Sequence, residues 1–192
     1  MDFSDALRES EFTIFRQTIA QGGVVRALCV PGGAVFSRKQ TDDLTTFVQQ
    51  CGAKGLVSLA LLGEGGLDEL REEDIRSPVA KYFTIEQVRE MARLAGAKRG
   101  DIFLMVADRP EAANKALDAL RRELASRLGL ADPNTLAFAF VIEYPMFEWS
   151  ECEERWMSSH HPFTSPRLED IPLMDSDPGH VRSRAYDLVC NG

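Results

Sequence analysis

The most unusual segment of this chain is a heptapeptide that begins with two adjacent histidines, HHPFTSP at residues 160–166. Its prolines restrict the backbone, and its hydroxyl groups can donate or accept hydrogen bonds. Because an imidazole donates to carboxylates and changes charge near neutral pH, the segment is typical of a loop that presents one histidine to an anionic or polar ligand. The structural alternative is a strand end with one histidine inside and one outside, and composition alone favours it.

A second candidate is the basic pair Arg38 and Lys39, which follows a proline-glycine-glycine turn at residues 31–33. Such a pair can bind a phosphate backbone if the fold gathers further basic residues around it. The chain has 22 basic and 30 acidic residues and a net charge of −8, so a nucleic-acid contact requires a local basic patch. Scattered solubilising charges are the alternative. The further basic residues considered for such a patch are Arg26, Lys54, Lys98 and Arg99.

Aromatic and acidic side chains crowd residues 144–154, which read YPMFEWSECEE. The aromatic part could stack on a base or ring, but such clusters more often plug the end of a strand. Acidic runs rich in turns are usually solvated surface, so we predict no metal site here. The sequence also lacks GxGxxG, Walker, HExxH and GxSxG motifs, and we therefore expect no catalytic residue of these common kinds.

Helical and extended patterns alternate through the first 130 residues. A strong capping signal, Thr84 with Gln87, begins one helix, and Asp108 with Pro110 is predicted to begin another. Thr41 is predicted to cap the helix that ends at Gly52. The expected helices cover residues 10–21, 41–51, 84–95 and 108–128, the expected strands cover 24–30, 55–62 and 101–106, and a charged loop with one helical turn covers 63–77.

This order of elements fits either a parallel α/β sheet or an α+β sandwich, and connection lengths do not decide between them. Turn-forming residues near 131–134 are followed by extended segments without helical periodicity. Residues 136–192 also hold ten acidic and four basic side chains, an excess of acid over the preceding part. We therefore predict two domains, residues 1–133 and 134–192.

Length and composition set wider limits. A chain of 192 residues can bury a core without disulfides or metal, and its four cysteines are spaced without a CxxC pair. Buried free thiols are the favoured interpretation. No apolar run approaches the roughly 20 residues of a membrane-spanning helix, so we expect a cytoplasmic protein without a membrane partner.

Several segments together resemble a known family. Residues 25–59, 77–84, 100–108 and 116–130 look like the GAD insertion domain of bacterial-type aspartyl-tRNA synthetases. The segments FVIEYPMFEW, HHPFTSP and RAYDLVCNG are similar to the part of the class II catalytic domain that follows that insertion. A GAD domain also occurs in an archaeal glutamyl-tRNA(Gln) amidotransferase, where a tRNA- or protein-binding module is the alternative function. The histidine and AYDLVCNG segments favour the synthetase.

The resemblance implies an α+β fold, with a two-layer GAD domain whose antiparallel sheet is covered by helices, and extended β segments from the catalytic sheet. It also implies a homodimeric parent enzyme that activates L-aspartate with ATP and Mg²⁺ and transfers it to tRNA. In that family the first histidine of the loop contacts aspartate, which implies this role for His160 and, less directly, a place in the same pocket for His161.

The family's motifs 2 and 3, which clamp ATP, are not found in this chain. We therefore expect a fragment that holds no bound cofactor and has no activity by itself. The role of the GAD part stays open between bracing the catalytic sheet and touching tRNA or a protein through Arg38 and Lys39.

Overall fold

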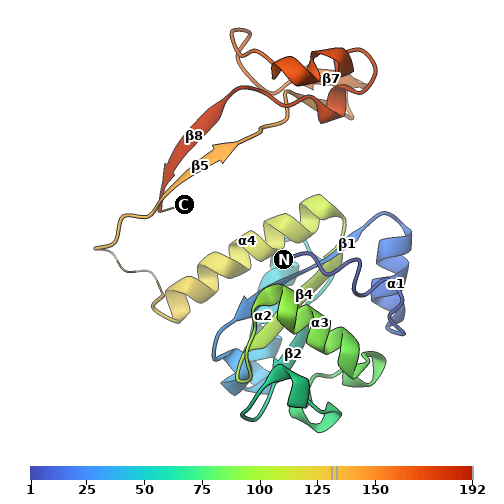
Figure 1. Ribbon diagram of the computed structural model, residues 1–192, viewed down its shortest axis with the longest axis vertical. Helices are drawn as coiled ribbons and strands as arrows, with labels where there is room; N and C mark the ends of the chain where they lie inside the picture. The colour runs from blue at the N-terminus through green and yellow to red at the C-terminus, as the bar shows by residue number, and fades with distance from the viewer. Residues whose placement is uncertain (131, 133, 192) are drawn as a thin grey trace. The chain divides into compact units, whose positions relative to one another are not determined.

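The computed structural model describes residues 1–130, 132 and 134–191. These residues form two compact units, Met1–Ala131 and Asp132–Gly192, which we call the N-terminal and C-terminal units (Figure 1). The predicted boundary lies at residue 133, outside the described residues, and stays a prediction. Across the part of the chain that is described, every helix is too short or too polar to cross a membrane.

An antiparallel sheet forms the centre of the N-terminal unit. Its strands lie in the order β1-β4-β2-β3, and β1 pairs with β4 along its whole length, from Val24 opposite Asp108 to Val30 opposite Ile102. The antiparallel pairing excludes the parallel α/β alternative that the order of elements left open. The strands are β1 Val24–Val30, β2 Val57–Leu61, β3 Ile75–Arg76 and β4 Ile102–Asp108.

Both faces of this sheet are buried. Along β4, Phe103 and Met105 belong to one apolar cluster, whereas Ile102, Leu104 and Val106 belong to the other. Side chains of a strand point alternately to the two faces, so an unbroken run of buried apolar residues requires a cover on each side. The sheet therefore has helices on both faces.

Two helices supply each cover. Phe15 of α1 and Met91 of α3 belong to the first cluster, and Leu44 of α2 and Leu120 of α4 belong to the second. The predicted α+β class, with an antiparallel sheet covered by helices, is confirmed. The unit differs from the expectation in having three layers, because β4 is apolar on both faces. The helices are α1 Thr13–Ala20, α2 Arg38–Gln50, α3 Ile85–Ala95 and α4 Pro110–Arg127.

Capping side chains define where α2 and α3 begin. The predicted capping box of α3 is present, with Thr84 accepting from the backbone N–H of Gln87. For α2 the predicted cap, Thr41, is wrong. Ser37 caps this helix in a reciprocal pair with Gln40, and the Thr41 hydroxyl donates to the Arg38 carbonyl within the first turn at 2.8 Å. A Ser-x-x-Gln box satisfies two backbone donors, so it starts the helix earlier.

The start of α4 also differs from the expectation. Asp108 is the last residue of β4 and is buried, and the helix begins at Pro110 without a side-chain cap. The Asp108 carboxylate accepts from the backbone N–H groups of Arg109, at 2.9 Å, and Lys54, at 3.2 Å. It therefore ties two loops together instead of capping the helix.

The charged segment at residues 63–77 is more ordered than the predicted loop. It contains two short 3₁₀ turns, Leu67–Glu69 and Glu72–Asp74, followed by β3, which pairs with Ala60 and Leu61 of β2. Further 3₁₀ turns lie at Gly33–Val35 and Ala80–Tyr82. A two-residue strand is too short to leave an alternating pattern, which explains why the sequence did not indicate it.

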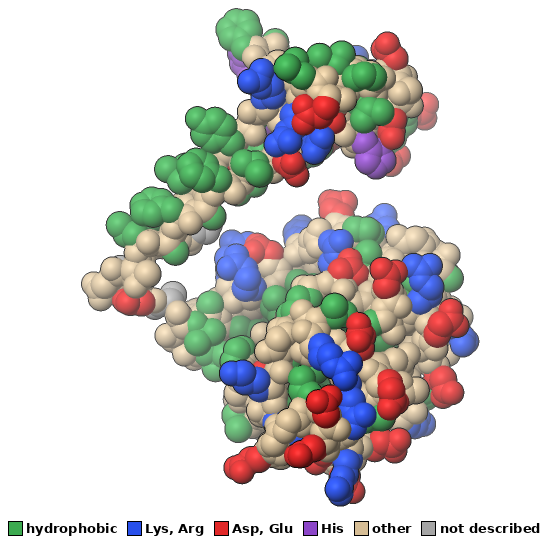
Figure 2. Space-filling model, in the orientation of Figure 1, with side chains coloured by type: hydrophobic (Ala, Val, Ile, Leu, Met, Phe, Trp, Pro, Cys, Tyr) green, Lys and Arg blue, Asp and Glu red, His purple; other side chains and the backbone are tan. Residues whose placement is uncertain are grey.

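The C-terminal unit consists of two antiparallel ribbons and two 3₁₀ turns. The apolar side chains of its first ribbon stand on the surface (Figure 2). Of these, Phe138 and Phe140 are 62% and 66% exposed. Among the described residues of this unit, the buried apolar side chains are Met146 and Val181. The elements are β5 Phe138–Ile142 with β8 Tyr186–Cys190, β6 Phe147–Ser150 with β7 Arg155–Ser158, and the turns Leu168–Leu173 and Pro178–His180.

Candidate functional site: the histidine loop and its anchors

The histidine loop, which we define as residues 159–167, is fastened at both ends by backbone hydrogen bonds. At its start, the N–H of Ser159 donates to the carbonyl of Met146 at 3.1 Å. At its end, the N–H of Arg167 donates to the carbonyl of Arg182 at 2.9 Å, and the N–H of Arg184 donates to the carbonyl of Ser165 at 3.0 Å. The loop therefore lies on two other segments of the unit.

Those two segments, residues 144–146 and 181–184, are also bonded to each other. The N–H of Met146 donates to the Val181 carbonyl, and the N–H of Ser183 donates to the Tyr144 carbonyl, both at 2.7 Å. Val181 and Ser183 are 0% and 1% exposed. We call this pair of segments the framework, because it carries both ends of the histidine loop.

His160 is held against the framework by its ring. Its Nε2 lies 3.1 Å from the carbonyl oxygen of Pro145, so the Nε2–H donates there, and its ring meets the Tyr144 ring edge-on at 5.8 Å between centroids. The ring is half-buried. The described residues offer no hydrogen-bond partner to Nδ1, which leaves this nitrogen available to a ligand.

His161 has a different environment. It is exposed, its Nδ1 accepts from the backbone N–H of Phe163 at 3.3 Å, and its ring meets the Phe163 ring edge-on at 4.7 Å. Phe163 itself is 92% exposed. The loop thus has one histidine partly inside and one outside, as in the structural alternative, while the inner one still keeps a free ring nitrogen.

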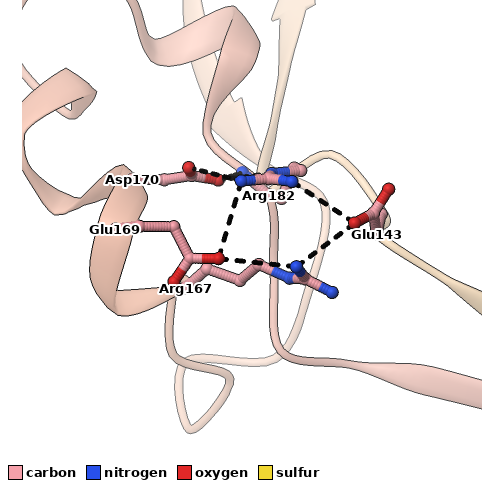
Figure 3. A network of polar contacts seen from close by, with 5 residues as sticks. All are labelled: Glu143, Arg167, Glu169, Asp170 and Arg182. Atoms are coloured by element: carbon pink, nitrogen blue, oxygen red, sulfur yellow. Dashed lines mark hydrogen bonds and ion pairs between the residues drawn. The ribbon is translucent and has the colours of Figure 1, made fainter.

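A polar network lies directly behind the loop, and Figure 3 shows Arg182 at its centre, between Asp170 and Glu143. Arg182 donates to the two carboxylate oxygens of Asp170 through Nε at 2.8 Å and Nη2 at 2.9 Å, and its backbone N–H donates to Asp170 at 3.0 Å. The Asp170 side chain is 7% exposed. Three hydrogen bonds from one residue to a buried carboxylate make this a strong local contact.

The remaining members close a ring of ion pairs around that contact. Glu143 lies 3.3 Å from Arg182 and 3.2 Å from Arg167, and Glu169 lies 3.6 Å from Arg182 and 3.4 Å from Arg167. Glu143 also has a left-handed backbone, with φ of 64°, where the chain leaves β5. Three acids face two bases here, so the network does not suit an anionic ligand.

The ionisation of the central pair follows from these contacts. Hydrogen bonds from the Arg182 guanidinium, and then from its backbone N–H, lower the pKa of Asp170 from 3.8 to about 2. The same carboxylate raises the pKa of Arg182 above its ordinary value. Both groups are therefore charged at neutral pH.

An open hollow of about 430 Å³ lies beside this network, lined in part by Arg167, Leu168 and Tyr186. Sequence reasoning did not find the network. One signal was available, because only four basic residues occur after residue 135, and three of them, Arg167, Arg182 and Arg184, follow the histidines. Basic residues within an acidic segment are expected to form specific ion pairs with its carboxylates.

The basic residues proposed for a phosphate-binding patch do not form one cluster. Lys54 and Arg38 lie near opposite ends of β4. The ammonium of Lys54 lies 3.7 Å from the carboxylate of Asp108, the last residue of the strand. The turn before Arg38 instead bonds to the carbonyl of Gly100, which precedes the strand. Arg26 pairs with Asp2 and Arg99 with Asp74, each at 2.9 Å. Most of these charges are therefore used locally.

Arg38 and Lys39 remain as an exposed pair at the start of α2. The Arg38 side chain is 95% exposed and lies 3.9 Å from Asp42, and the described residues give Lys39 no ion pair. The preceding turn carries Val35, which is 84% exposed. This corner of the N-terminal unit can meet a partner, but it is small.

The other candidate features have structural roles. Met146 is buried, as a plug requires, whereas Trp149 and Trp156, which meet edge-on across β6 and β7 at 5.6 Å, are 47% and 41% exposed. All four cysteines are free, but Cys152 and Cys190 are exposed, so the expectation of buried thiols is wrong for these two. They lie in the unit with the smaller core. Within the described residues, no three His, Cys, Asp or Glu side chains gather as metal ligands.

Comparison with known proteins gives one match within the N-terminal unit and others along the whole chain. The model of the GAD domain family matches residues 15–117, which lie in the N-terminal unit. Proteins named aspartate–tRNA(Asp/Asn) ligase match the whole chain, with 44% identity in Dehalococcoides mccartyi, 49% in Moorella thermoacetica and 42% in Geotalea uraniireducens. The matches cover 100% of this chain but 32%, 30% and 31% of those proteins. The chain therefore spans about a third of the length of these relatives.

Proposed function

The chain belongs to the GAD domain family, and we propose that it works as part of an aspartate–tRNA ligase. The observation that carries this proposal is the extent of the match, since the relatives named as ligases align with both units and not with the GAD domain alone. A binding module of the amidotransferase type accounts for the N-terminal unit but not for the histidine loop. The proposed enzyme joins aspartate to tRNA and acts in the cytoplasm.

In this function the histidine loop contributes to aspartate binding. Activation requires the aspartate α-carboxylate to attack the α-phosphate of ATP and displace pyrophosphate, so the amino acid must be held in line while its charges are compensated. The Nε2–H of His160 is directed to the Pro145 carbonyl, which leaves Nδ1 for the ligand. When the ring is protonated, Nδ1 also donates and can bond to a carboxylate.

The residues of this chain do not by themselves fit ATP with Mg²⁺. The described residues contain no group of three metal-ligating side chains, and Arg167 and Arg182 already face carboxylates. We therefore assign ATP and magnesium binding to the remaining length of the enzyme. The 192-residue chain alone is expected to show no aspartate-dependent exchange of pyrophosphate into ATP.

The test is His160→Ala in a longer protein that contains this chain and shows that exchange. Loss of a hydrogen bond to a charged group costs about 1.5 to 3 kcal/mol, so kcat/KM for aspartate should fall roughly 10- to 100-fold. His180→Ala is the matched control, because His180 is exposed and bonds to Asp177 at 2.8 Å. Unchanged aspartate kinetics in His160→Ala would remove His160 from the site.

A second role, contact with tRNA, is favoured by the exposed pair Arg38 and Lys39. Gel shifts of the chain with tRNA at increasing salt test it, because each phosphate contact adds about 0.7 to 0.9 to the slope of log K against log salt. Replacing both residues with Gln should reduce the slope, and replacing Arg121 and Arg122, which pair with Asp118, should not. If the chain does not bind, a bracing role remains.

A further inference from the structure

We propose that Arg182 is a positioning residue, which locks the framework through Asp170 and thereby fixes the direction of the His160 ring. This inference rests on the proposed role of His160 in aspartate binding. Neither Arg182 nor Asp170 needs to touch the substrate. We call the contact between Arg182 and Asp170 the clamp. It acts on the Pro145 carbonyl, which accepts the hydrogen bond from the His160 ring.

The clamp joins three parts of the chain at one point. Arg182 lies between Val181 and Ser183, whose backbone groups bond to Met146 and Tyr144. The backbone carbonyl of Arg182 accepts from the N–H of Arg167, the last residue of the histidine loop. The side chain of Arg182 binds Asp170, which lies three residues after Arg167. A change at residue 182 therefore affects both ends of the loop.

The acceptor of the His160 ring is fixed by the same contacts. Pro145 lies between Tyr144 and Met146, and both of these neighbours bond to the segment that contains Arg182. The Pro145 carbonyl has no freedom to turn while both bonds persist. The clamp thus acts on His160 through one short strand pairing.

Among the described residues of the C-terminal unit, the clamp is the most buried ion pair. The C-terminal unit has little buried apolar surface to hold the framework, and Val181 and Met146 are its buried apolar side chains among the described residues. Removing the guanidinium would leave the Asp170 carboxylate, 7% exposed, without its main partner. An unpaired buried charge is unfavourable, so we expect the turn that carries Asp170 to shift until the carboxylate is hydrated.

Nitrogen-15 NMR of the full 192-residue chain tests the clamp directly, because the chain has only three histidines to assign. In the unchanged chain, neutral His160 should be the Nε2–H tautomer, as its bond to Pro145 requires. In Arg182→Ala and Asp170→Asn, we expect a mixture of tautomers at His160, with His161 and His180 unchanged. Arg182→Lys should not restore the single tautomer, since an ammonium cannot reproduce the two-pronged contact.

Arg155→Ala is the matched control, because Arg155 belongs to the same unit and pairs with Glu153 at the surface. It should leave the His160 spectrum unchanged. A His160 spectrum that is also unchanged in Arg182→Ala would overturn the proposal.

The indole signals of Trp149 and Trp156 show whether the unit remains folded in each variant. If Arg182→Ala unfolds it, Asp170→Asn, which keeps the side-chain volume and one acceptor, gives the decisive spectrum. Collapse of the indole signals in every clamp variant would mean that the clamp only maintains the fold, and the proposal would fall.

Kinetics of the longer enzyme separate this inference from the function on which it rests. Arg182→Lys should raise KM for aspartate roughly tenfold, because small misplacements of a binding group are costly, and should leave KM for ATP unchanged. If His160→Ala does not alter aspartate use, the proposed role of His160 in aspartate binding fails, while the NMR result still stands. If His160→Ala acts and Arg182→Lys does not, the positioning role alone is contradicted.

Discussion

Two strands of similar length, β4 in the N-terminal unit and β5 in the C-terminal unit, have opposite environments. Residues 102–106 of β4 are all buried, whereas every residue of β5 is exposed. Both strands are apolar in sequence, so composition does not distinguish them. What differs is the cover, since helices lie on both faces of β4 and the described residues of the C-terminal unit provide no helical layer over β5.

This difference shows that the two units are held by different forces. Burial of apolar surface, which contributes roughly 25 cal/mol per Å², holds the N-terminal sheet, because both of its faces are packed. An isolated two-stranded ribbon is marginal in water, so the C-terminal unit depends on its clamp and backbone pairings to hold the histidine loop.

The largest predicted effect concerns matched phenylalanines in the two units. Phe103→Ala removes a fully buried ring that meets Phe3 edge-on, and should cost about 3 to 5 kcal/mol. Phe163→Ala removes a ring that is 92% exposed and should change stability by about 0.5 kcal/mol or less. Urea unfolding is followed by circular dichroism at 222 nm for the N-terminal unit, which contains the four α-helices of the described residues, and by tryptophan fluorescence for the C-terminal unit, which contains Trp149 and Trp156. Similar losses in both variants would refute the contrast.

The next effect is a dependence on acid that belongs to the C-terminal unit. The pKa of Asp170 is about 2 in the folded chain and 3.8 ordinarily, so the clamp contributes fully above about pH 4. Between pH 4 and 2 the unfolded chain binds the proton first, and this contribution is lost as the pH falls. Asp170→Asn should therefore lower the urea midpoint of tryptophan fluorescence at pH 7, with the difference shrinking toward pH 2. A difference that does not vary with pH would contradict the assignment.

The smallest effect tests a helix start in the N-terminal unit. Ser37→Ala removes the cap of α2 and should lower the free energy of unfolding by about 1 kcal/mol. The loss should appear in urea unfolding followed by circular dichroism at 222 nm, and not in unfolding followed by tryptophan fluorescence. Thr41→Ala should be nearly neutral, because that hydroxyl bonds within the first helical turn. A larger loss of stability in Thr41→Ala than in Ser37→Ala would show that Thr41 caps the helix, as the sequence predicted.

Local patterns predicted the elements well where one signal dominated. The strand at residues 24–30 and the capping box at Thr84 were predicted as they occur, because no competing pattern overlaps them. The start of α2 was misplaced since two possible caps lie four residues apart. Strand direction and the second helical layer depend on contacts between distant residues, which periodicity does not contain.

The histidine loop could be found from its rare composition, but its anchors could not. Glu143 and Arg182 are 39 residues apart, and Asp170 lies 12 residues before Arg182. No short motif joins such positions, which are brought together by the pairing of residues 144–146 with 181–184 and by the hydrogen bond from Arg167 to Arg182. The resemblance to a family indicated His160, while the geometry indicates what holds it.

Hydrogen exchange of the unmodified chain, resolved residue by residue, tests the difference between the units most directly. Amides of β1 and β4 should be the most protected, the framework amides of Met146 and Ser183 intermediate, and those of β5 and β8 the least protected. Protection of β5 and β8 equal to that of β4 would show that the C-terminal ribbon is stable by itself, and the account would be wrong.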